Sequence, residues 1–75
     1  MKKIVVGHAI VFSFIRFLEQ LGIDFEQEVN PKLDVFTISD QDWNLLRLSS
    51  LRGNFVKVPD GYQYTGYQYL NLNTL

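Results

Sequence analysis

The sequence predicts a small α+β fold, and two observations support this prediction. The 75-residue chain contains one strongly amphipathic helical stretch between His8 and Gly22. Around it lie short runs rich in β-branched and aromatic residues, separated by glycine and proline, which are typical of strands. A chain of this length holds one core, so we expect residues 1–75 to form a single domain.

The stretch from His8 to Gly22 is the segment around which we expect the core to form. At about 100° per residue, its large apolar side chains fall on one stripe, with polar residues opposite. The stripe comprises Ile10, Phe14, Phe17, Leu18 and Leu21, with Val11 at its edge. Gly22 ends the helix, because glycine adopts the left-handed conformation at low cost. Phe12 projects from the polar side, where it is either covered by a neighbouring segment or available to another subunit.

Short strands are predicted around a turn in the first half of the chain. Lys3–Gly7 is rich in β-branched residues and ends at a glycine, which is typical of a short buried strand. Residues 24–30 alternate acidic side chains with others, and Leu33–Ser39 is a run of strand-forming residues. Asn30-Pro31-Lys32 is a turn sequence, so these two strands are expected to form a hairpin.

A second helix is predicted to begin after Ser39 and to run to Gly53. Ser39 caps it, and the acidic Asp42, three positions later, meets the positive end of the helix. Its expected inward face consists of Leu45, Leu48 and Leu51, with Trp43 and Leu46 on a different face. A fourth strand, Asn54–Val58, follows.

The predicted element order is therefore β-α-β-β-α-β. This order is that of the ferredoxin-like plan, a four-stranded antiparallel sheet with both helices on one face. Right-handed crossovers leave few other topologies for these elements. Residues 59–75 are extra to this plan and are expected to extend it.

The extension is rich in tyrosine and begins with a turn at Pro59-Asp60-Gly61. GYQYT is followed by the near-repeat GYQYL. A hairpin turning at Thr65-Gly66 would place all four tyrosines on one face, whereas a straight strand would divide them between two faces. These tyrosines are Tyr62, Tyr64, Tyr67 and Tyr69. Residues 71–75 are expected to continue as a strand that pairs with the edge of a second copy.

The residue types offer little catalytic chemistry. His8 is the only histidine, and it has no glycine-rich phosphate loop or nucleophile associated with it, so we expect a structural role. Asp24, Glu26 and Glu28 form an acidic row that is expected to face solvent and deter edge pairing. The chain has no cysteine. We therefore predict no catalytic residue, no metal site, no cofactor and no enzymatic activity.

Charge and hydropathy narrow the classes of partner. The formal net charge of −1 does not provide the basic field with which proteins bind phosphate backbones. The apolar stretch near the N-terminus stops at Arg16, which is too short to span a bilayer. No cleavage site of small residues follows it, so a signal peptide is not expected. The lack of cysteine fits a reducing compartment, and a cytoplasmic location is expected.

These observations favour a non-enzymatic interaction or regulatory module that binds a protein partner, a second copy of itself, or both. Aromatic residues make up 15% of the chain, and such residues are enriched at protein interfaces. Very small proteins of this kind are common among regulators from phages and mobile elements. The predicted contact residues are Tyr62, Tyr64, Tyr67, Tyr69, Trp43 and Phe12. One alternative is a binder of single-stranded nucleic acid, because RNA-recognition domains share the element order and IVVGHA is loosely similar to their first-strand motif, although without its aromatic residue. A small-ligand domain of the ferredoxin-like plan is the other alternative.

Overall fold

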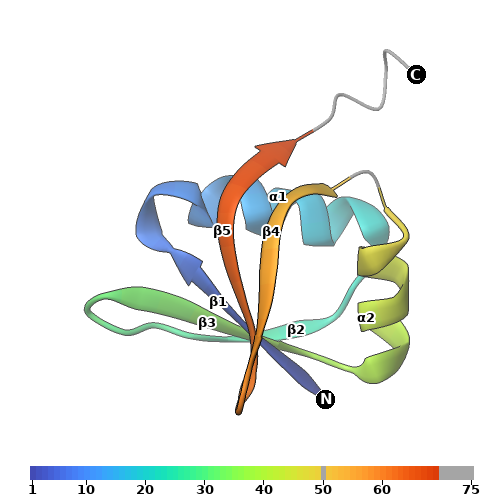
Figure 1. The fold of residues 1–75 in the computed structure, drawn as a ribbon. Coiled ribbons are helices and arrows are strands. Elements are labelled where there is room, and N and C mark those ends of the chain that lie inside the picture. The colour runs from blue at the N-terminus through green and yellow to red at the C-terminus, as the bar shows by residue number, and fades with distance from the viewer. Residues whose placement is uncertain (50, 70–75) are drawn as a thin grey trace.

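Five strands form one sheet that carries two helices on one face (Figure 1). The computed structural model describes the backbone of residues 1–49 and 51–69 and the side chains of residues 1–49 and 55–64. The strand order across the sheet is β2-β3-β1-β5-β4. The predicted α+β class is thus confirmed, whereas the ferredoxin-like strand order is only partly correct.

The main helix forms where the apolar stripe predicts it. A 3₁₀ turn, η1 (His8–Ile10), leads into α1 (Val11–Leu21), and Gly22 ends the helix with a φ of 72°. The stripe faces the sheet and buries its central residues, which are Val11, Phe14, Phe17 and Leu18. Within residues 1–49 and 51–69, neither helix has the length and apolar character needed to cross a membrane.

The first three strands pair as predicted. β1 (Lys2–Gly7) lies antiparallel to β3 (Leu33–Ile38), and β2 (Phe25–Glu28) lies antiparallel to the other side of β3. In the turn before β3, the side-chain carbonyl of Asn30 accepts hydrogen bonds from the backbone N–H groups of Lys32 and Leu33, both at 2.9 Å. Such a bond lets asparagine replace a backbone acceptor in a tight turn, which explains the hairpin.

The second helix is shorter than predicted. α2 (Asp40–Arg47) begins as expected, with the Asp42 N–H donating to Ser39 Oγ at 3.1 Å, but it ends six residues before Gly53. The predicted inward face is wrong, because Leu45 and Leu48 are exposed and Leu51 begins a strand. The buried residue is Leu46, three positions after Trp43. The ring of Trp43 packs on aromatic side chains of the last two strands, and this contact fixes which side of α2 faces inward.

The last two strands depart from the predicted plan. β4 (Leu51–Val58) is an edge strand, and β5 (Gly61–Tyr69) lies between it and β1. β5 is antiparallel to β4 and parallel to β1, so the sheet is mixed instead of purely antiparallel. Figure 1 shows β4 and β5 as a long curved hairpin that passes in front of α1 in this view. The ferredoxin-like plan would instead place β4 directly beside β1.

A single lysine explains why β4 takes the edge. The strand pairing gives Phe55 and Lys57 of β4 the same phase as Tyr64 and Tyr62 of β5, which face the helices. In the central position, Lys57 would carry its ammonium under the helices, where an unpaired charge is costly. At the edge the ammonium stays exposed, 5.4 Å from the centre of the Tyr62 ring. β5 brings Tyr64 into the centre, where only 1% of it is exposed.

The predicted hairpin at Thr65-Gly66 is wrong. β5 runs through these residues as one strand, and the hairpin turn lies earlier, at Pro59 and Asp60, where Val58 pairs with Gly61. Because β5 is continuous, it pairs with β1 on one side and with β4 on the other, which a strand folded back on itself could not do. The predicted strand at residues 71–75 lies outside the described residues.

Candidate functional site

Most of the described aromatic side chains form one connected cluster inside the molecule. Phe14 of α1 packs between Phe36 and Tyr64, with ring centres 5.2 and 5.5 Å apart. Phe55 extends this cluster. Its ring is stacked 4.6 Å from that of Tyr64 and contacts the Trp43 ring edge-on at 5.4 Å. Such pairs add to the free energy of burial beyond their area. The aromatic excess of the sequence therefore serves mainly the core.

Three of the six predicted contact residues belong to this aromatic cluster. Tyr64 is buried between α1 and the sheet, where a partner cannot reach it. Trp43 and Tyr62 are partly buried and stack on each other at 4.2 Å. The expected ribbon with four tyrosines on one face does not form, because β5 is a single strand. The side chains of Tyr67 and Tyr69 lie outside those that the structure describes.

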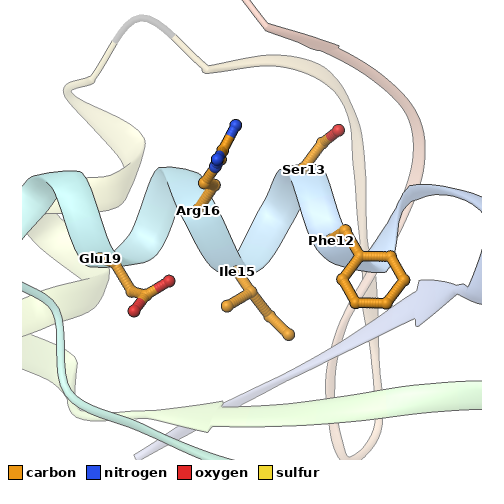
Figure 2. Close-up of a pocket in the computed structure, with 5 residues that line it drawn as sticks. All are labelled: Phe12, Ser13, Ile15, Arg16 and Glu19. Carbon is orange, nitrogen blue, oxygen red and sulfur yellow. The ribbon is translucent and has the colours of Figure 1, made fainter.

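Phe12 lies where the helical periodicity places it, on the outer side of α1. Its side chain is 86% exposed, the largest exposure among the large hydrophobic residues described. Figure 2 shows Phe12, Ile15 and Glu19 projecting from one side of the helix and Arg16 from the other. Together with Ser13, these residues line a shallow groove of about 320 Å³.

His8 and Asp34 form a pair at the end of β1. The imidazole Nδ1 lies 2.8 Å from Asp34 Oδ2 and donates a hydrogen bond to it. The Asp34 side chain is only 5% exposed, whereas that of His8 is 48% exposed. The buried carboxylate therefore has a partner that stays in contact with water. This contact joins the start of η1 to β3.

The surroundings of His8 favour its charged form. The pKa of His8 is raised above 6.5, first by the hydrogen bond to Asp34 and further by the backbone carbonyls of Pro31 and Asn30, while partial burial opposes the shift. A ring bonded to acceptors holds its protons, so it is poorly suited to take a proton from a substrate at neutral pH. The pair thus supports the predicted structural role of His8.

The sheet face opposite the helices is open and largely aliphatic. One row crosses all five strands in register, because the cross-strand pairs link each residue to the next. This row runs Glu28, Val35, Val5, Gln63 and Val56. A second row, one pleat away, includes Glu26, Thr37 and Lys3, with Gly61 and Val58 beyond. A shallow hollow of about 160 Å³ lies over this face.

The acidic row has the solvent-facing position that was predicted for it. Asp24, Glu26 and Glu28 are exposed along the edge strand β2 or just before it. Among the side chains described, no three histidine, aspartate or glutamate residues are close enough together to hold a metal ion. These carboxylates therefore act as a charged border of the open face.

Sequence reasoning missed Asp34 and the open face, although both left a signal. Asp34 lies on the same side of β3 as Phe36 and Ile38, so its carboxylate points inward and needs a polar partner. His8, the only histidine in the sequence, was a candidate for that partner. The open face was hidden because the strands are apolar at both phases. Val5, for example, lies between Ile4 and Val6, and such a run is typical of a strand covered on both sides.

Two surfaces are therefore candidates for binding: the groove at Phe12 and the open face of the sheet. Neither contains a converging set of catalytic groups among the described side chains. Both offer apolar contact with charged groups beside it, which suits association with a protein. No protein-family model, curated protein or solved structure matches the chain.

Proposed function

We propose that this protein is a non-enzymatic interaction module that binds a protein partner through the outer face of α1. The observation that supports this function best is the exposure of Phe12, which leaves 86% of a phenyl side chain in water. The core does not need this residue, because Phe14 and Phe17 already fill the space between α1 and the sheet.

The groove supplies the features of a contact centred on one aromatic residue. Burying an exposed phenylalanine contributes about 1.5–3 kcal/mol to binding, and aromatic residues often dominate the energy of an interface. Ile15 extends the apolar area by one helical turn. Arg16 and Glu19 offer one charge of each sign beside it, which sets the orientation of a partner more than its affinity.

The positions of the tyrosines favour a protein partner over single-stranded nucleic acid. RNA-recognition domains stack bases on aromatic residues of the open sheet face. Here Tyr62 and Tyr64 face the helices, and the open face presents Val5, Val35 and Gln63 in their place. The acidic border of that face would also repel phosphate groups.

Replacing Phe12 tests the proposal directly. Phe12→Ser is expected to reduce partner capture from host lysate at least about tenfold, because it removes the apolar anchor. Leu48→Ser is the matched control, since Leu48 is a similarly exposed residue (74%) at the C-terminal end of α2. Quantitative mass spectrometry of the captured proteins provides the measurement. Both variants should keep the stability of the wild type within about 0.5 kcal/mol.

A photo-crosslinking amino acid at each position then identifies direct contact. The proposal predicts that a crosslinker at position 12 traps the same protein that Phe12→Ser fails to capture, and that one at position 48 does not. Equal capture by both serine variants would show that α1 is not the contact surface.

A further inference from the structure

We propose that the open face of the sheet binds the open face of a second copy, forming a symmetric dimer with two stacked sheets. This inference concerns a different surface from the groove at Phe12. Its success or failure is therefore independent of the proposed partner binding. Three features support it: the aliphatic character of the face, its short side chains, and an arrangement of charges that complements itself.

The face is more apolar than a sheet face that serves only to meet solvent. Antiparallel sheets with one solvated face usually alternate strictly between apolar and polar residues. Here aliphatic residues occupy the outward phase of β1, β3 and β4. They are Val5, Leu33, Val35, Val56 and Val58. Val5 and Val35 are direct cross-strand partners at the centre of this surface.

The shape of the face suits another sheet better than it suits a helix or an extended peptide. Its central side chains are short and mostly β-branched, and the hollow of about 160 Å³ that lies on it is shallow. Side chains of this kind interdigitate when two sheets stack about 10 Å apart. A peptide ligand, in contrast, binds best in a deep groove or beside a free strand.

A two-fold axis parallel to the strands, between β1 and β3, brings complementary groups together. Such an axis places each strand opposite a partner strand, so β1 faces β3 and β5 faces β2 of the second copy. In the first row, Val5 then meets Val35 of the other copy. Gln63 meets Glu28, whose carboxylate accepts a hydrogen bond from the amide.

The second row places the opposite charges together. Glu26 of one copy faces Gly61 of the other, which is the strand neighbour of Lys3, so its carboxylate lies within reach of the lysine ammonium. Each dimer contains this contact twice, because the axis repeats it. Other central axes perform worse, since one along β1 would set the two Lys3 side chains against each other.

The size of the face sets the expected strength of the dimer. Three overlapping strands of about six residues and the four-residue β2 cover about 350 Å² per copy, from the strand spacing and the rise per residue. This footprint is about 7% of the 5048 Å² accessible surface. The total buried area of about 700 Å² is below that of standard specific interfaces, so we expect a weak dimer with a dissociation constant on the order of 100 µM.

Exchanging the charges provides the sharpest test. Sedimentation velocity is measured over a concentration series that spans about 1 µM to 1 mM. Lys3→Glu alone and Glu26→Lys alone should each weaken the dimer at least about tenfold, because like charges then meet twice. An equimolar mixture of the two variants should restore dimers to near the wild-type level, because both contacts are again between opposite charges. This rescue cannot arise from misfolded protein.

Two further variants separate the open face from other causes of association. Val5→Thr with Val35→Thr keeps the shape and β-branching of both residues and should also weaken the dimer. Arg47→Glu changes the net charge as Lys3→Glu does, but it lies on α2, away from the open face. This variant should leave the dimer intact. A wild-type chain that is monomeric at every concentration would overturn the proposal. So would a dimer that all these variants leave unchanged, or a mixture without rescue.

Discussion

The hydrogen bond between His8 and Asp34 joins a half-exposed side chain to a buried one and stabilises both. The Asp34 carboxylate lies inside the sheet–helix interface, where a charge without a partner would be costly. The half-exposed imidazole supplies the partner, and in return the carboxylate favours the protonated ring. The pair therefore links the free energy of unfolding to pH.

We predict that the protein loses stability as the pH rises above neutrality. The folded-state pKa of His8 is raised above its ordinary value of 6.5. The stabilisation from the charged ring is therefore fully present below about pH 6.5 and is lost as the pH rises through the folded-state pKa. Urea unfolding of the wild type between about pH 6 and pH 8.5 measures this loss.

His8→Gln is the control for this pH dependence. Glutamine can still donate a hydrogen bond to Asp34 but has no charge to lose. The difference in stability between the wild type and this variant should therefore shrink as the pH rises. A constant difference over the same range would contradict the linkage.

At the level of elements, two glycines set the ends of a helix and a strand for different reasons. Gly22 ends α1 in the left-handed conformation, with open space around the position of a Cβ atom. Gly61 begins β5 with a φ of 151°, and a Cβ atom there would overlap the backbone of Lys3. The first position is restricted by conformation alone, and the second also by packing against β1.

Alanine substitutions should separate these two effects. Gly22→Ala is expected to lower the free energy of unfolding by about 1 kcal/mol, which is the cost of a left-handed alanine. Gly61→Ala should cost about 3 kcal/mol or more, because the parallel pairing of β5 with β1 must shift. Gly7→Ala is the control, since Gly7 has an ordinary φ of −67° and no atom near the added methyl. Equal losses at Gly22 and Gly61 would contradict the steric argument.

At the level of the whole molecule, β5 is the element that connects the two halves of the sheet. It pairs with β1 on one side and with β4 on the other, and it places Tyr64 against Phe14 at the centre of the core. In the plan predicted from the sequence, residues beyond Val58 would only extend a complete domain. In the observed topology, β5 is the only strand beside β4 within residues 1–49 and 51–69.

A chain that ends at Asp60 is therefore expected not to fold cooperatively. It lacks β5, so β4 loses its neighbour and the core loses Tyr64. Circular dichroism during urea unfolding should show no cooperative transition. Tyr64→Ala in the full chain should fold but lose about 3–5 kcal/mol, as is usual when a large core aromatic is truncated. Cooperative unfolding of residues 1–60 would show that β5 is dispensable.

The sequence alone determined the features that depend on neighbouring residues. The stripe of α1, its end at Gly22, the Ser39 cap and the turn after Asn30 follow from local periodicity and local hydrogen bonds, and the structure confirms each one. Helical phase also placed Phe12 on the outer side of α1. These features can be predicted because no distant part of the chain competes with them.

Only the tertiary structure decided which strand fills the centre and which faces remain open. β4 and β5 both read as strands, and the choice between them depends on burying Tyr64 and keeping the Lys57 ammonium in water, which requires the whole sheet. The inward side of α2 likewise depends on where Trp43 meets β5. Alternation within a strand defines two faces but does not say which of them the helices cover. The open face therefore emerged only once the sheet was assembled.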